Sequence, residues 1–239
     1  MKLTIVETGL APAAIRDRFP DYPEMFRRMF DAAGAGFACE TVSVARGQNL
    51  PDPAGLEAVL YTGSPAGVYD DEPWIGPLMN FIRAGAQAKL PQVGICFGHQ
   101  IMAEALGGKV VKSDKGWGVG RHTYAVAGTP GWQGEAPPAM SIAVSHQDQV
   151  VAKPPAAEIV ACSAFTEFAG LSYGDFPGLS FQCHPEFDPE FSAALYSARR
   201  GVSLSEEAAD AAIASLEGAC DRRFLAQWIV SFLKTSSGS

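Results

Sequence analysis

The residues best suited to chemistry lie in Gly94-Ile95-Cys96-Phe97-Gly98, where a short apolar stretch ends and a helical pattern begins. Glycines around a central nucleophile are typical of a nucleophile elbow, a cramped strand-to-helix turn that holds the central side chain out of the sheet. The adjacent helix N-terminus favours a thiolate, the nucleophilic form of cysteine. The pattern predicts Cys96 as a nucleophile, and a buried structural cysteine is the alternative.

A second motif, Gln182-Cys183-His184-Pro185-Glu186, follows an apolar strand near the other end of the chain. A thiol nucleophile needs a base, and the base needs an acceptor that sets its tautomer. In an extended chain His184 and Glu186 project to one side, and Cys183 points to the other. We therefore predict a Cys96, His184 and Glu186 triad. Taken alone, a His-x-Glu pair is more often a structural histidine beside a solvated glutamate.

Together, GICFGHQ at 94–100 and HPEF at 184–187 resemble the class I, or triad, glutamine amidotransferases in motif and in chain order. The segments TGSPAGVYDDEPWI at 62–75 and SHQDQV at 145–150 add to the resemblance, which extends from residue 3 to about residue 200. The chain is similar to free-standing relatives of the GMP synthetase amidotransferase domain and to γ-glutamyl peptidases. The resemblance implies an enzyme that cleaves a γ-glutamyl amide through a thioester.

The resemblance also implies a role for each catalytic position. Cys96 corresponds to the nucleophile, His184 to the general base and then acid, and Glu186 to the carboxylate that orients the imidazole. Backbone N–H groups of Ser64 and Phe97 correspond to the oxyanion donors. Gly63 lies beside the first of them, and Pro65 has no N–H to offer.

The substrate contacts that the resemblance implies are Gln100, Trp117 and Gly120, in addition to Gly63. Gln100 lies one helical turn beyond the nucleophile, on the same face of the helix. Many family members carry an acidic residue where this chain has Gly118, so the resemblance does not fix the details of substrate recognition. An ordinary polar helix residue is the alternative for Gln100, and a core residue is the alternative for Trp117.

The elements that must position these motifs alternate between short strands and helices, which predicts an α/β class. We expect strands at 3–7, 37–45, 56–61, 92–96 and 177–181, and helices at 22–33, 73–86, 98–106, about 203–216 and 222–233. Pro73 should lie in the first turn of its helix, and Ser203 with Glu206 should form a capping box. Strands and turns should dominate 109–182, with a Gly- and Pro-rich connection at 128–138.

We expect one domain over 1–239, with a motif-bearing core at about 3–200 and C-terminal helices at about 203–233. The resemblance implies a flavodoxin-like central mixed, largely parallel sheet flanked by helices, with the elbow at the carboxyl ends of the strands.

The amino-acid composition argues against two classes of binding partner. The formal net charge of −8 and pI of about 5.0 disfavour nucleic acid and anionic membrane surfaces. The N-terminus has no signal-peptide pattern, so we expect a cytoplasmic protein. The five cysteines and four histidines lack metal-ligand spacing, and no dinucleotide motif is present, so we expect neither a metal nor a cofactor.

His99 and His122 are expected to be structural, and His146 either structural or a support for the site.

Three functional hypotheses follow, of which the first two differ in the leaving group. A glutaminase would supply ammonia to a separate synthetase subunit, because the chain contains no P-loop. A free-standing γ-glutamyl hydrolase would cleave γ-glutamyl amines or peptides by the same chemistry. An inactive binding or regulatory subunit is the third reading. The motifs leave open the physiological substrate, the ammonia acceptor, the oligomeric state and the pathway.

Overall fold

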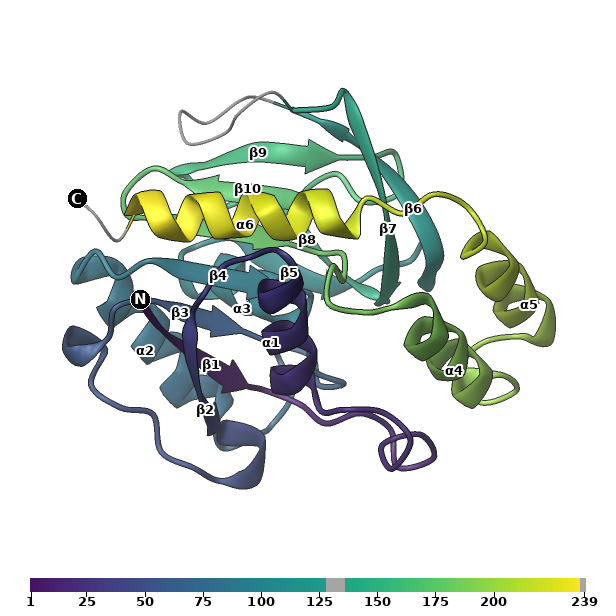
Figure 1. Cartoon of the computed structure of the whole chain (residues 1–239), viewed down its shortest axis with the longest axis horizontal. Coiled ribbons are helices and arrows are strands. Elements are labelled where there is room, and N and C mark those ends of the chain that lie inside the picture. Colours follow the sequence, from purple (N-terminus) through teal and green to yellow (C-terminus); the bar gives the residue numbers. More distant parts are fainter. Residues whose placement is uncertain (128–135, 237–239) are drawn as a thin grey trace.

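The computed structural model describes residues 1–127 and 136–236 (Figure 1). Within them, nine strands form one sheet in the order β2-β1-β3-β4-β11-β10-β9-β6-β7, and β5 pairs with β8. The strands are β1 (Lys2–Glu7), β2 (Ala38–Ser43), β3 (Val59–Tyr61), β4 (Gln92–Ile95), β5 (Lys109–Lys112), β6 (Gly118–Val126), β7 (Ala139–His146), β8 (Asp148–Ala152), β9 (Ala157–Cys162), β10 (Gly170–Tyr173) and β11 (Gly178–Phe181). The helices are α1 (Tyr22–Ala32), α2 (Ile75–Gln87), α3 (Phe97–Ala105), α4 (Pro189–Arg199), α5 (Glu206–Ser215) and α6 (Arg222–Ser236).

The sheet is mixed, as the family resemblance implied. Strands β2, β1, β3, β4 and β11 run parallel to one another, and β10, β9, β6 and β7 continue the sheet antiparallel. Parallel strands end at the same edge of a sheet, so the segments that follow them meet there. The segments after β1, β3, β4 and β11 begin with residues 8, 62, 96 and 182, and this edge therefore gathers both predicted motifs.

Helices cover both faces of the parallel half: α1 and α6 pack on one face, and α2 and α3 lie on the other (Figure 1). The alternation of side chains along β1 shows why both faces are buried. Leu3 and Ile5 join the core beneath α1 and α6, whereas Val6 joins the core beneath α2 and α3. Helices α4 and α5 pack against each other and against β6, beyond the parallel strands.

Two expected helix starts are wrong. Helix α2 begins at Ile75 with Trp74 as its N-cap, so Pro73 precedes the helix. Helix α5 is capped by Ser205, whose Oγ accepts from the N–H of Ala208 at 3.1 Å. Ser203 instead lies in the turn that ends α4, where its N–H donates to the carbonyl oxygen of Arg199, and it precedes the N-cap position of α5.

Two of the expected strands are each three residues shorter than predicted. The strand expected at 37–45 stops at residue 43, because a 3₁₀ turn follows at Val44–Arg46. The strand expected at 56–61 begins only at residue 59, after a 3₁₀ turn at Pro53–Gly55. The connection expected at 128–138 lies mostly outside the described residues. In the described ranges, no helix is both long enough and apolar enough to span a bilayer.

Candidate active site

Cys96 is the N-cap of α3 and follows β4 directly, with φ 54° and ψ −103°. A positive φ costs a residue with a side chain about 1–3 kcal/mol, and such strain persists only where the surroundings enforce it. Here the backbone N–H of Cys96 donates to the carbonyl oxygen of Phe181 at 2.9 Å. The carbonyl oxygen of Cys96 accepts from the N–H of Gln100 at 3.0 Å. Bonds to β11 and to α3 thus hold this side chain at the carboxyl edge of the sheet.

The glycines of the motif allow a very close approach of three elements. A Cβ on Gly98 would lie 2.3 Å from the backbone oxygen of Tyr61, at the end of β3. A Cβ on Gly94 would lie 2.4 Å from the backbone oxygen of Gly98. Both obstacles are backbone atoms, so no side chain can move aside to relieve the clash. The elbow therefore requires glycine at both positions.

We expect Gly98→Ala to lower the free energy of unfolding by at least about 1–3 kcal/mol, because α3 must move away from β3. Thermal unfolding measures the loss. Gly76→Ala, in α2, is the matched control: nothing lies within 4 Å of a Cβ there. Helix propensity predicts that the free energy of unfolding of this control rises by up to about 1 kcal/mol. An unchanged melting temperature for Gly98→Ala would contradict the close packing at the elbow.

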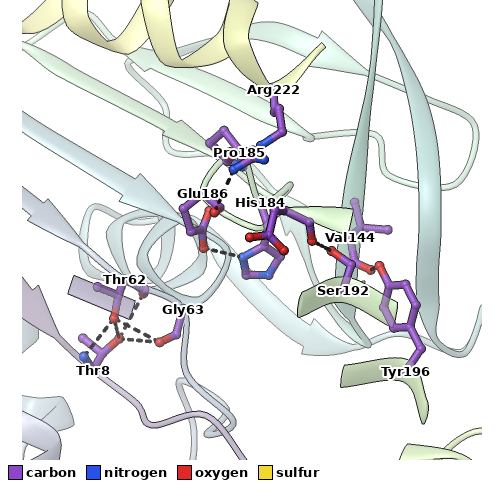
Figure 2. A network of polar contacts seen from close by, with 11 residues as sticks. Thr8, Thr62, Gly63, Val144, His184, Pro185, Glu186, Ser192, Tyr196 and Arg222 are labelled. Carbon is purple, nitrogen blue, oxygen red and sulfur yellow. Dashed lines mark hydrogen bonds and ion pairs between the residues drawn. The ribbon is translucent and has the colours of Figure 1, made fainter. Parts of the chain in front are cut away.

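His184 and Glu186 lie in a turn after β11 (Figure 2). The expectation of an extended chain here is wrong, since the N–H of Phe187 reaches back to the carbonyl oxygen of His184 at 3.4 Å. The turn nevertheless brings the two side chains together, with His184 Nδ1 2.7 Å from Glu186 Oε1. Both side chains are almost completely buried, at 4% and 1% exposed. Because a carboxylate accepts, Nδ1 carries a proton and Nε2 is left for Cys96.

The surroundings of His184 favour the imidazolium. Burial lowers its pKa, but the charges of Glu186 and Cys96, with hydrogen bonds to both, outweigh burial and raise the pKa to about 10. The ring of Phe187 stacks on the imidazole, with centroids 4.0 Å apart and planes 4° apart. Arg222 donates to the carbonyl oxygens of Pro185 and Glu186 at 3.1 and 3.2 Å (Figure 2). These contacts fix the position of the ring.

The turn after β3 lies against the same two side chains. A Cβ on Gly63 would be 3.1 Å from His184 Cε1 and 3.7 Å from Cys96 Cβ. Thr8 ties this turn to β1, donating its Oγ1 to the carbonyl oxygen of Gly63 at 3.2 Å (Figure 2). Phe97 occupies the first position of α3, where an N–H has no acceptor within the helix. We propose this N–H and that of Ser64 as the oxyanion donors.

Two hollows meet at Cys96. The larger, of about 500 Å³, includes His184, and we call it the His184 hollow. The smaller, of about 270 Å³, includes Gln100, and we call it the Gln100 hollow. Ser64, Ser145 and Arg199 line both. The His184 hollow also contains Thr8, Leu10, Arg16, Tyr22, Phe187 and Leu195, and the Gln100 hollow also contains Tyr69, Asp70, Lys112, Trp117, His146 and Asp148.

The predicted substrate contacts do not all reach these hollows. Gln100 does, and its Nε2 donates to the carbonyl oxygen of Asp148 at 2.9 Å and to Gln182 Oε1 at 3.1 Å. Its own Oε1 is left as an acceptor. Trp117 also lines the Gln100 hollow. Gly120 lines neither hollow, because it packs on α5, where a Cβ would lie 2.6 Å from Ser215 Oγ.

Arg199 is a site residue that no sequence motif predicted. It ends α4 and lines both hollows, donating to Ser145 Oγ at 2.6 Å. Its guanidinium carbon lies 4.6 Å from the centroid of the Trp117 ring. The sequence gives only a weak signal for it, since a basic residue in the last turn of a helix is common wherever the helix lies.

The remaining histidines are buried or half-buried, and of them His146 lines the Gln100 hollow. Burial lowers the pKa of His99 and of His146 to about 3, so both are neutral. His99 Nδ1 lies 2.8 Å from Ser180 Oγ, and His146 Nδ1 donates to the carbonyl oxygen of Asp148 at 3.0 Å. Burial also lowers the pKa of His122. Over 1–127 and 136–236, no three His, Cys, Asp or Glu side chains are grouped as metal ligands.

Comparisons with known proteins agree with the two motifs. The family model for glutamine amidotransferase class-I matches residues 27–199. A glutamine amidotransferase-like protein of Schizosaccharomyces pombe is 29% identical over 245 residues, 97% of this chain and 98% of that protein. γ-Glutamyl peptidase 3 of Arabidopsis thaliana is 31% identical over 196 residues, 77% of this chain and 78% of that protein. The crystal structure of a Thermotoga maritima glutamine amidotransferase superposes with a TM-score of 0.78 at 18% identity, covering 100% of this chain and 99% of that one. The predicted family is thereby confirmed: the chain belongs to the class I glutamine amidotransferases.

Proposed function

We propose that this chain hydrolyses γ-glutamyl amide bonds through a thioester on Cys96. The observation that carries the proposal is the strained backbone of Cys96 beside a buried histidine and glutamate pair, with His184 Nδ1 2.7 Å from Glu186 Oε1. Strain of this kind is characteristic of functional positions. A base within reach of a thiol and a carboxylate behind the base are the parts that covalent catalysis needs.

In the proposed reaction, the Cys96 thiolate attacks the γ-carbonyl carbon, and a C–S bond forms as the carbonyl electrons move onto oxygen. The N–H groups of Ser64 and Phe97 stabilise this oxyanion. The C–N bond then breaks as His184 gives its Nε2 proton to the departing nitrogen, leaving a thioester. His184 next removes a proton from water, which attacks the thioester, releases glutamate and restores the thiolate.

The two hollows suggest how the substrate lies. The departing nitrogen must be within reach of His184, so the leaving group occupies the His184 hollow and the γ-glutamyl group occupies the Gln100 hollow. Gln100 Oε1 and the carboxylate of Asp148 suit the α-ammonium group of the substrate. Lys112 and Arg199 suit its α-carboxylate.

The size of the His184 hollow favours a free-standing γ-glutamyl hydrolase over a glutaminase that releases only ammonia. Ammonia is about as large as water, which occupies about 30 Å³. A hollow of about 500 Å³ has room for a much larger leaving group. A glutaminase would instead need a separate synthetase to receive its ammonia. An inactive subunit would have no need of the strained elbow.

The experiment compares glutamate release from glutamine with release from γ-glutamyl amines and γ-glutamyl dipeptides. We expect extended γ-glutamyl compounds to be cleaved with a kcat/KM at least about tenfold above that for glutamine, because the interactions of a larger leaving group contribute to transition-state binding. Added hydroxylamine should divert the thioester to a γ-glutamyl hydroxamate. Cleavage of glutamine alone, or activity only with an added synthetase, would favour the amidotransferase subunit. No cleavage of any γ-glutamyl compound would refute the proposal.

A further inference from the structure

The outer wall of the His184 hollow is built by the connection between β1 and α1, residues 8–21. This connection contains a helical turn in which the N–H of Ile15 and the N–H of Arg16 both donate to the carbonyl oxygen of Pro12, at 3.0 and 3.1 Å. Ile15 is 3% exposed and packs in an apolar cluster with Phe187 and Leu195. The turn is therefore anchored, and it presents Arg16 to the hollow.

The charge of this hollow opposes that of the whole protein. The chain has 26 acidic and 18 basic residues, yet the hollow is lined by two arginines, Arg16 and Arg199, and by one carboxylate, Glu72. Across the described residues, no carboxylate forms an ion pair with Arg16. Its guanidinium is thus available to an anion carried by the leaving group.

An apolar wall leads from the reacting centre to this cation. Phe187 stacks on the His184 imidazole, so the wall begins beside the departing nitrogen. Tyr22 continues it, with its ring centroid 5.8 Å from that of Phe187. Leu195 belongs to the same apolar cluster and also lines the hollow, and Ile15 in that cluster anchors the turn that carries Arg16. A leaving group that matches this order carries an amine, then an apolar side chain, then an anion.

We propose that Arg16 binds the terminal carboxylate of an apolar amino acid or short peptide that leaves as the amine. Arg16 is then the residue that selects γ-glutamyl peptides over γ-glutamyl amines, and this inference rests on the proposed hydrolase function. A guanidinium matches a carboxylate with two parallel N–H donors, which lysine cannot reproduce.

The test uses γ-glutamyl-leucine and γ-glutamyl-leucyl-glycine, each beside the same compound with its terminal carboxylate converted to an amide. We expect wild type to prefer the carboxylate form of at least one pair by about tenfold in kcat/KM, mostly through KM. Arg16→Gln should abolish that preference and leave cleavage of the amide form unchanged. Arg18→Gln is the matched control, since Arg18 lies in the same turn and stacks on Phe19 outside the hollow. This control should keep the wild-type preference.

The outcomes separate the two proposals. If wild type cleaves both forms of both pairs equally, or if Arg16→Gln weakens both forms alike, the role of Arg16 is refuted and the hydrolase proposal stands. If wild type releases no glutamate from any of the four compounds and none from glutamine, both proposals fall. Loss of the preference in Arg18→Gln as well would also refute a specific role for Arg16.

Discussion

Replacing Cys96 with alanine is expected to lower kcat for γ-glutamyl cleavage by about 10⁶-fold, to the rate that binding alone sustains. The thioester route needs the sulfur atom, and His184 alone cannot form a covalent intermediate. Glutamate release measures the loss, and intact-protein mass spectrometry should show a γ-glutamyl adduct on wild type but none on Cys96→Ala. The fold should survive, because the smaller side chain leaves the backbone bonds of the elbow in place.

Cys183 supplies the matched control for this substitution. It precedes His184 in the chain and is fully buried, and burial raises its pKa well above the usual range for a thiol. It therefore remains a protonated core side chain, and Cys183→Ala should lose stability but keep activity within a few fold. Full activity in Cys96→Ala, or loss of the adduct in Cys183→Ala, would place the nucleophile elsewhere and end the proposed mechanism.

The elbow could be predicted because its determinants are local. The nucleophile and the glycines that let α3 approach β3 fall within five consecutive residues, Gly94 to Gly98. The pairing of His184 with Glu186 was predicted for a partly wrong reason. The two residues lie in a turn rather than in extended chain, and the side chains still meet at 2.7 Å.

The walls of the hollows could not be predicted, because no local pattern reveals them. Arg16 belongs to an irregular connection, and Arg199 ends a helix that the sequence did not place beside Cys96. Tertiary packing brings them together. Gly120 shows the opposite case: the family position implied a substrate contact, but the residue is needed where β6 packs closely on α5. A glycine in a motif indicates that another group packs closely against it, but the motif does not identify that group.

Replacing Glu186 with glutamine is expected to lower kcat/KM by about 10⁴-fold while leaving the thiol in place. The amide can donate to His184 Nδ1, which favours the wrong tautomer and removes the charge that stabilises the imidazolium. Glu190→Gln is the matched control, since Glu190 is exposed in the first turn of α4. It should change kcat/KM by less than about twofold.

The same substitution, Glu186→Gln, should change the titration of His184 and the pH dependence of the free energy of unfolding. Nearby charges raise the pKa of His184 to about 10, whereas an unfolded histidine titrates near 6.5. A raised pKa means that the bound proton stabilises the fold fully below about pH 6.5 and that this contribution is lost as pH rises through about 10. In Glu186→Gln the midpoint should move to lower pH, and unfolding free energy should fall less between pH 7 and 10. NMR titration of the His184 ring and denaturant unfolding across this range measure both effects. A His184 midpoint near 6.5 in wild type, unaffected by Glu186→Gln, would show that the carboxylate neither charges nor orients the imidazole.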